Sequence, residues 1–448
     1  MPTSTSEAVR VAVLADSDTR WKWGALTARR IAPSTSVELS GFLLRGRATP
    51  TARQLAEVGV RADDLREVTA NEFLRAMKDE SYDVVVLALV GGGVQAMLHG
   101  LAALHQARRP VVVTGYVGVV YEKLSDGLLL RHGADIVLAN SRHDADRFRA
   151  VYEGVGADAS AVTEAALPFL GGAPYTPQEG RDTVVFAVQP SVPESRADRT
   201  YLLRRLVEHA RLHPEREVLL KLRSKPGEHT THLEEVPYQK LAERLPGGLP
   251  PNFRLVYGHM GEVLDRTDLL VTVSSTAALE SLHRRIPTAV LTDLGVRESL
   301  GNHHFLGSGL FASWDQLDGG HRPVPDAEWL SRQGVAAGGP ATPPGTAGDS
   351  YEAAFDEARK RVAELLLVPA LPAPAPYYTP TTAPGYLPGI LARHHLAPDG
   401  TPLAGAAPAA EVTGLRRVVR DAVREVARGA YRHGVQRVAP VIRRMGQL

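Results

Sequence analysis

The chain of 448 residues contains no cysteine. This absence excludes disulfide bonds, metal sites built on thiolates and catalysis by a cysteine nucleophile. Aromatic residues make up only 6% of the sequence, whereas hydrophobic residues make up 44%. The cores must therefore be built mainly from valine, leucine and alanine.

The chain also lacks an excess of charge of either sign and a long apolar run. Its 51 Lys and Arg residues against 50 Asp and Glu residues give a net charge of +1, so the global balance gives no indication of a nucleic-acid partner. No apolar run reaches the ~18 residues that a membrane-spanning helix needs. Residues 1–10 are polar and lack the apolar core of a signal peptide. The simplest expectation is a cytoplasmic protein.

Apolar strand-like segments alternate with helix-like segments through most of the chain. Strands that are apolar throughout and separated by helices are typical of a doubly wound parallel sheet. The predicted strands are residues 9–14, 37–44, 83–90, 110–114 and 135–139, followed by 183–188, 217–222, 253–257, 269–273 and 288–292. A Gly- and Pro-rich stretch at 167–181 separates the two sets. The predicted fold is α/β, with two tandem Rossmann-like doubly wound domains, residues 8–166 and 181–330, facing a cleft.

The last quarter of the chain has a different composition. Residues 331–410 are predicted to be a Gly/Pro-rich linker, with a mobile loop at 331–349, a helix at 351–367 and poorly ordered chain from residue 368. Arginine recurs among valines in residues 411–448, which predicts a basic amphipathic helix. Such a helix could lie on the anionic inner face of the plasma membrane. The alternatives are that it packs on the domains or binds an acidic partner.

The most informative segment is residues 269–280, where an apolar run ends in Ser274, Ser275 and Thr276 and a helical pattern follows at once. This order is typical of a buried parallel strand that delivers its carboxyl end into a helix. A helix N-terminus presents free N–H groups that bind anions, so these residues are predicted to hold the phosphate of a sugar nucleotide. The alternative is that Ser275 or Thr276 caps the helix without a ligand.

Further candidate donor-binding residues follow other strands of the second domain. Arg223, Ser224 and Lys225 come directly after one strand, and the two cations could hold a diphosphate or a carboxylate-bearing donor. A solvated basic turn is the alternative. His259 could bind a phosphate or ribose, or else cap a helix or pack. Glu280, one turn into its helix, could reach ribose hydroxyls or simply be solvated.

Acidic residues in the first domain are the candidates for catalysis. Asp16 and Asp18 follow the first strand, and either could deprotonate an acceptor hydroxyl as general base, unless one caps the next helix. Asp126, which precedes Gly127, is a third acid near the predicted cleft. The Asp-x-Asp form of the first pair would need further oxygen ligands to bind a metal, and none can be named. Gly91–Gly93 would let a backbone approach a ligand closely, but it does not match the GxGxxG dinucleotide pattern.

Two tandem Rossmann-like halves, with phosphate-binding loops in the second, resemble a GT-B glycosyltransferase over roughly residues 8–330. A Ser-Ser or Ser-Thr pair at a strand end is similar to the donor-phosphate motif of bacterial sialyltransferases and polysialyltransferases. In those families a His-Pro motif contacts the CMP part of the donor, and here Lys225 precedes Pro226 in that place. Their acidic motif has two acids before a glycine, and the nearest match, residues 125–127, has only Asp126.

A second resemblance lies in residues 114–120, Thr-Gly-Tyr-Val-Gly-Val-Val, and in residues 131–142. These stretches are similar to an actinobacterial glycosyltransferase family associated with nonulosonic (sialic or Kdn-like) acid glycans. The resemblance implies a CMP-activated nonulosonic acid as donor and a cell-surface or wall glycan as acceptor. Because GT-B enzymes generally need no bound metal, it also implies no metal and no cofactor beyond the nucleotide-sugar substrate.

The sequence therefore predicts a metal-independent inverting glycosyltransferase, with the donor on the second domain and a glycan or lipid-linked acceptor at the first. Two enzymatic alternatives on the same fold remain open, a UDP-sugar glycosyltransferase and a UDP-sugar 2-epimerase. A third alternative is a non-catalytic scaffold that binds a sugar nucleotide and uses its basic tail for assembly.

Overall fold

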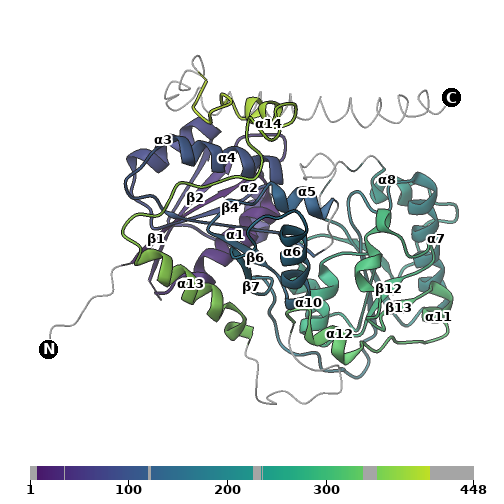
Figure 1. The fold of residues 1–448 in the computed structure, drawn as a ribbon. Coiled ribbons are helices and arrows are strands. Elements are labelled where there is room, and N and C mark those ends of the chain that lie inside the picture. Colours follow the sequence, from purple (N-terminus) through teal and green to yellow (C-terminus); the bar gives the residue numbers. More distant parts are fainter. Residues whose placement is uncertain are drawn as a thin grey trace. The chain divides into compact units, whose positions relative to one another are not determined.

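The computed structural model describes residues 8–34, 36–119, 123–223, 225, 234, 236–335 and 351–403. The described residues form two compact units. Unit 1 contains the chain up to Leu170, residues 330–335 and residues 351–403, and unit 2 contains Gly171–Trp329. Each unit is built on its own sheet (Figure 1).

Unit 1 is a parallel sheet of seven described strands in the order β3-β2-β1-β4-β5-β6-β7. The strands are β1 (Val9–Ala15), β2 (Val37–Leu44), β3 (Asp64–Val68), β4 (Val84–Ala88), β5 (Val111–Gly115), β6 (Ile136–Ala139) and β7 (Val162–Glu164). The helices are α1 (Asp18–Ile31), α2 (Ala52–Val58), α3 (Ala70–Asp79), α4 (Gly91–Ala103), α5 (Leu124–Leu129), α6 (Arg142–Gly154), η3 (Tyr351–Phe355), α13 (Asp356–Leu366) and α14 (Leu387–Arg393). The central strands are apolar throughout because helices cover both faces of the sheet.

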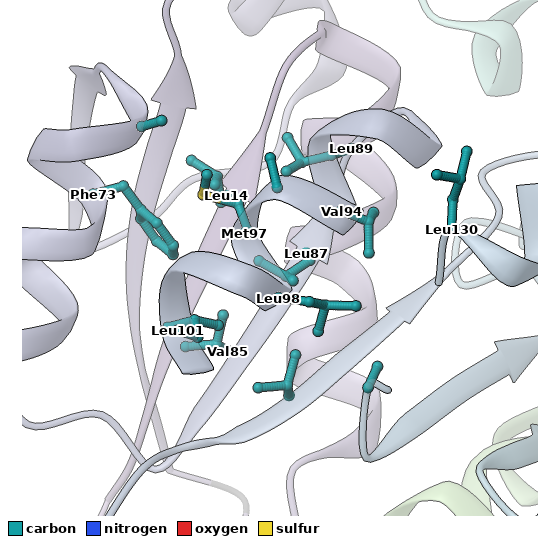
Figure 2. Packing of buried hydrophobic residues seen from close by; sticks show 14 of the residues in the cluster. Leu14, Phe73, Val85, Leu87, Leu89, Val94, Met97, Leu98, Leu101 and Leu130 are labelled. Carbon is teal, nitrogen blue, oxygen red and sulfur yellow. The ribbon is translucent and has the colours of Figure 1, made fainter. Parts of the chain in front are cut away.

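Alternate residues of β4 show how the sheet separates two cores. Val85 and Leu87 point toward α4, where they pack with Val94, Met97 and Leu98 (Figure 2). The intervening residues of β4 belong to the opposite core, which is shared with α1 and α13. A strand whose side chains alternate between two covered faces buries every residue, and this explains the unbroken apolar run.

Unit 2 repeats the same plan with six described strands in the order β10-β9-β8-β11-β12-β13. The strands are β8 (Thr183–Ala187), β9 (Glu217–Lys221), β10 (Phe253–Val256), β11 (Leu269–Thr272), β12 (Thr288–Leu291) and β13 (Phe311–Ala312). The helices are α7 (Arg196–Leu212), α8 (Tyr238–Ala242), α9 (Met260–Leu264), α10 (Ala277–His283), η1 (Glu298–Leu300), η2 (Asn302–Phe305), α11 (Trp314–Asp318) and α12 (Ala327–Ser331), the last of which ends in unit 1. All described pairings in both sheets are parallel. The prediction of two tandem doubly wound parallel sheets is confirmed.

The strands that the sequence did not predict, β3, β7 and β13, all lie at sheet edges. Edge strands need less apolar surface than central ones, and β3 is largely exposed while β13 has only two residues. Such short or polar segments give no alternating or continuous apolar signal, so the pattern could not find them.

The expectation of poorly ordered chain from residue 368 is wrong for residues 371–403, which we call the C-terminal strap. The strap packs on unit 1 beside α4, and Leu387, Leu391 and Leu396 lie in the same core as α4 (Figure 1). The carbonyl of Tyr378 accepts hydrogen bonds from α4 side chains. Proline lacks a backbone N–H, so a Pro-rich segment cannot form the regular hydrogen bonds of a strand. Its apolar side chains can still pack against a neighbouring helix when they are spaced as on a helix face. Residues 404–410 and the predicted basic helix at 411–448 lie outside the described residues.

In the described part of the chain, no helix is both long and apolar enough to span a bilayer.

Candidate functional site

Each sheet has one point where the strand order reverses direction, between β1 and β4 in unit 1 and between β8 and β11 in unit 2. In doubly wound sheets the loops at the carboxyl ends of these two strands diverge and leave a crevice for ligands. The loops at these two points carry Asp16 in unit 1 and Gln189 and Ser274 in unit 2.

Asp16 ties the two loops of the unit 1 switch point together. Its Oδ1 accepts a hydrogen bond from Arg20 Nη1 at 2.9 Å, and its Oδ2 accepts one from the backbone N–H of Val90 at 3.0 Å. Ser17 is the N-cap of α1, so neither neighbouring acid has the capping role that was the alternative. Asp18 is the first residue of α1, and its Oδ1 accepts from the N–H of Thr19 at 2.8 Å. Asp16 is therefore the acid at the switch point, and Asp18 is directed to its own helix.

Asp126, in the first turn of α5, is bound by the C-terminal strap. Its Oδ1 accepts from the hydroxyl of Tyr378 at 2.9 Å, and its Oδ2 accepts from the hydroxyl of Tyr386 at 3.0 Å. Burial raises the pKa of both phenols, and the Asp126 carboxylate raises it further, so both remain donors at neutral pH. Sequence reasoning could not anticipate this contact because the partners lie more than 250 residues apart in the chain.

The strap also covers the triple glycine. Gly91–Gly93 form the first turn of α4, and a Cβ at Gly92 would lie 3.7 Å from Cγ2 of Ile390 in α14. The group that approaches this turn is therefore an aliphatic side chain of the same protein. His394, at the end of α14, interacts with Asp16, and burial lowers the pKa of His394 although Asp16 opposes this.

Arg131 gathers the loops around these acids, and residue patterns did not single it out. Its guanidinium donates to the carbonyls of Gly115 at 3.0 Å, Gly127 at 2.7 Å and Leu89 at 3.3 Å, and it stacks on the ring of Tyr116. A buried arginine that binds carbonyls at the end of β5, within α5 and just after β4 fixes the relative positions of these three segments. Glu122, another acid of this region, lies outside the described residues.

The hydroxyl residues after β11 form the centre of the unit 2 site. Ser274 is 1% exposed, and its hydroxyl lies 2.5 Å from the carbonyl of Leu300 and 3.1 Å from Gln189 Oε1. The hydroxyl of Ser275 accepts from the N–H of Ala277 at 3.2 Å, which agrees in part with the capping alternative. Thr276 is the formal N-cap of α10 but makes no side-chain cap bond. Ser274 is thus structural, while Ser275 and Thr276 are half-buried at the carboxyl edge.

The other predicted donor residues have different surroundings. Lys225 is exposed, with its ammonium 6.0 Å from the centre of the Tyr257 ring, and Arg223 is also exposed. His259 is the N-cap of α9 without a side-chain cap bond. Glu280 is buried on α10, so the solvated alternative is wrong for it. Ser224 lies outside the described residues.

Gln189 and Arg199 are site residues that the sequence patterns missed. Arg199 is 1% exposed and stacks on Tyr238, and its Nη1 donates to the carbonyls of Gln189 at 3.4 Å, Pro190 at 2.9 Å and Pro193 at 3.3 Å. The loop after β8 is therefore held by α7, the helix that follows it. No sequence motif identifies a helix arginine whose side chain binds the carbonyls of the loop that precedes its helix.

One cluster in unit 2 has the composition of a metal site, namely His209, His213 and Asp318. Its contacts favour an ion-pair network instead. Asp318 Oδ2 accepts from Arg205 at 2.8 Å, and Asp318 Oδ1 accepts from His209 Nδ1 at 2.6 Å. Arg216 donates to His209 Nε2 at 3.3 Å. Two guanidinium groups on the would-be ligands leave an electrostatically poor position for a cation. The network fastens α11 to α7.

The same network predicts a loss of stability in acid. Burial lowers the pKa of His209, which stays neutral and accepts from Arg216, whereas the unfolded chain binds the proton near pH 6.5. The stability that neutral His209 contributes is present above pH 6.5 and is lost as the pH falls below it. We expect urea unfolding of the wild type to give a lower free energy at pH 5.5 than at pH 7.5. This decrease in unfolding free energy between pH 7.5 and pH 5.5 should be smaller in His209→Gln than in the wild type. It should equal that of the wild type in His321→Gln, a control at an exposed position. Equal decreases in all three proteins would contradict the assignment.

Comparisons with solved structures return proteins of low identity. A UDP-GlcNAc 2-epimerase from Neisseria meningitidis is 11% identical, with a TM-score of 0.48 over 80% of this chain and 100% of that one. A UDP-N-acetylglucosamine 2-epimerase from Rickettsia bellii is 11% identical, with a TM-score of 0.48 over 80% and 95%. A glycosyltransferase from Streptomyces nogalater is 16% identical, with a TM-score of 0.43 over 87% and 100%.

No curated protein sequence matches the chain. A family model does match, over residues 11–345, and its description reads "Putative glycosyltransferase (DUF6716)". The match includes both switch points and ends before the C-terminal strap. Because it covers well over half of the 448 residues, the chain belongs to this glycosyltransferase family.

Proposed function

We propose that the protein transfers a glycosyl group from a nucleotide sugar to a hydroxyl group of a glycan acceptor. The observation that carries the proposal is the unit 2 switch point, where Ser275 and Thr276 follow β11 beside the loop that Arg199 holds. The hydroxyl of Thr276 has no hydrogen-bond partner among the described residues, so it is available to a phosphate oxygen. The hydroxyl groups at this strand-to-helix turn are suited to bind a phosphate, whereas the backbone N–H groups of Ser274, Ser275 and Ala277 already have partners.

The cations near this switch point support a donor with a charged leaving group. Lys225 and Arg223 are exposed after β9, which is separated from β11 only by β8. We propose that they neutralise the phosphate as it departs, without a metal ion. The preferred donor is a CMP-activated nonulosonic acid, which the sequence resemblance favours. A UDP-sugar is the second candidate because Lys225 replaces the histidine of the His-Pro motif.

The acceptor is proposed to react at unit 1, with inversion at the sugar carbon. Asp16 is the acid of that switch point, and each of its oxygens accepts one hydrogen bond while retaining a further lone pair. We assign it as the general base that removes the acceptor proton. The Asp18 carboxylate accepts a hydrogen bond from Thr19, and the Asp126 carboxylate accepts hydrogen bonds from two tyrosines. Both acids are therefore weaker candidates for the general base.

The experiment is calorimetric titration of the full chain with CMP, CDP, UDP, GDP and ADP. Replacing Ser275 by Ala or Thr276 by Val should weaken binding of the preferred nucleotide by about 10- to 150-fold, because a hydrogen bond to a charged group contributes roughly 1.5–3 kcal/mol. Ser313→Ala is the matched control, since it removes the N-cap of α11 without touching the switch point. Selective binding of CMP supports the nonulosonic donor, and selective binding of UDP moves the assignment to a UDP-sugar. Failure to bind any nucleotide would overturn the proposal.

We also propose that residues 411–448 attach the enzyme to an anionic membrane surface that carries a lipid-linked or wall-polymer acceptor. The proposal rests on the arginine pattern of the sequence. Flotation with vesicles of phosphatidylglycerol and phosphatidylcholine should recover the full chain but not a chain that ends at residue 410. Equal recovery of the two proteins would exclude the membrane role.

A further inference from the structure

The side chain of Gln189 joins the two loops of the unit 2 switch point. It follows β8, and its Oε1 lies 3.2 Å from the backbone nitrogen of Ser274 and 3.1 Å from the Ser274 hydroxyl, after β11. A backbone N–H can only donate, so the amide atom that faces it must be the oxygen. The orientation of the Gln189 amide is therefore fixed by the residue that precedes Ser275.

Fixing the oxygen also fixes the amide nitrogen. Nε2 of Gln189 carries two N–H donors, and within the described ranges it has no hydrogen-bond partner. Gln189 is only half-buried, so a ligand or solvent can reach the group. The backbone of Gln189 is held in place, because Arg199 donates hydrogen bonds to the carbonyls of Gln189, Pro190 and Pro193. Arg199 is itself paired with Glu234.

We propose that Gln189 Nε2 donates a hydrogen bond to a phosphate oxygen of the sugar-nucleotide donor. The inference rests on the proposed function and deepens it, since it names a binding residue that no motif indicates. A neutral amide whose acceptor is already occupied presents only donors, and phosphate oxygens present only acceptors. An N–H that points at a charged oxygen forms the stronger class of hydrogen bond. The unit 2 site then combines three groups from two loops, namely Gln189, Ser275 and Thr276.

The charge of the ligand decides which substitution is most informative. Gln189→Glu keeps one acceptor oxygen for Ser274 and replaces the donor nitrogen by an anionic oxygen. A phosphate would then meet a like charge instead of a donor, while an uncharged nucleoside would not. Gln189→Met keeps the length of the side chain but removes both the acceptor and the donor. Gln316→Met is the matched control, because the Gln316 side chain accepts from the N–H of Ser313 in a capping box away from the switch point.

The test is calorimetric binding of UDP, CMP, uridine and cytidine to the full chain and these three variants, with thermal unfolding measured in parallel. We expect Gln189→Glu to bind the preferred nucleotide at least tenfold more weakly, with the matching nucleoside and the melting temperature little changed. Gln189→Met should lose nucleotide affinity as well, and Gln316→Met should lose thermal stability alone.

Two results would overturn the assignment. The first is nucleotide affinity in Gln189→Glu equal to that of the wild type. The second is an equal loss of nucleotide and nucleoside affinity, which would mean that Gln189 acts only on the fold of the loop. If the wild type binds neither UDP nor CMP, the proposed donor site fails and this inference fails with it. If the wild type binds a nucleotide and Gln189→Glu binds it equally well, only the role of Gln189 is overturned, and the proposed donor site stands.

Discussion

Asp16→Asn is expected to lower the rate of glycosyl transfer by about 10²–10⁴-fold, because a positioned general base contributes that much. The amide keeps the size of the side chain and one acceptor oxygen for Arg20 or Val90, so the fold of the switch point should survive. The measurement is the rate of nucleotide release from the nucleotide sugar whose nucleotide binds best. Nucleotide affinity should not change, since the donor is proposed to bind unit 2.

Asp18→Asn is the matched control for that substitution. Asp18 accepts a hydrogen bond from the N–H of Thr19 at 2.8 Å, and the same exchange of carboxylate for amide should change the rate only a few-fold. A large loss in Asp18→Asn with a small loss in Asp16→Asn would reverse the assignment of the base. Equal retention of activity in both variants would exclude base catalysis by this pair. A wild type that binds nucleotide without releasing it from any sugar donor would favour the scaffold.

Leu391→Ala is expected to destabilise unit 1 by about 2–5 kcal/mol, which is the usual cost of truncating a buried leucine. Leu391 is 0% exposed and packs in the core shared with α4. Leu367→Ala is the matched control, since Leu367 is 82% exposed and should cost within about 0.5 kcal/mol. Urea unfolding of both variants measures the difference. If Leu391→Ala behaves like Leu367→Ala, the C-terminal strap is not part of the folded core.

The C-terminal strap binds Asp126, one of the three acids that the sequence suggests for catalysis. Tyr378 and Tyr386 occupy both oxygens of Asp126, and Ile390 covers the first turn of α4. The Asp126 carboxylate therefore holds the strap to α5. Of the three acids suggested by the sequence, this one has the clearest structural role, and Asp16 retains the strongest case for catalysis.

The central strands could be predicted from the sequence because they are buried on both faces. Each residue of β4 meets one of two cores, so the whole strand is apolar and the pattern is unambiguous. The same strands end at the loops that carry Asp16 and Ser274, which is why a simple rule about carboxyl ends found both positions. Local composition sufficed for these strands because burial on both faces makes nearly every residue apolar, whichever segments supply the contacts.

The contacts that complete the sites are distant in sequence, and no local pattern records them. Gln189 meets Ser274 across 85 residues, and Tyr378 meets Asp126 across 252. Composition gave the wrong expectation for the strap, because proline excludes the hydrogen-bond ladder of a strand but not the docking of Leu387 and Leu391 on a helix. In each case the structure depends on tertiary contacts, which local secondary-structure propensity does not encode.

The most direct test of the donor site is hydrogen exchange of the full chain with and without its preferred nucleotide. We predict slower exchange in the loops after β8 and β11, around Gln189 and Ser275, because a ligand that binds these loops must suppress their local opening. Exchange in the strap around Tyr386 should not change. Protection confined to unit 1, or no protection in the loop after β11, would contradict the placement of the donor on unit 2.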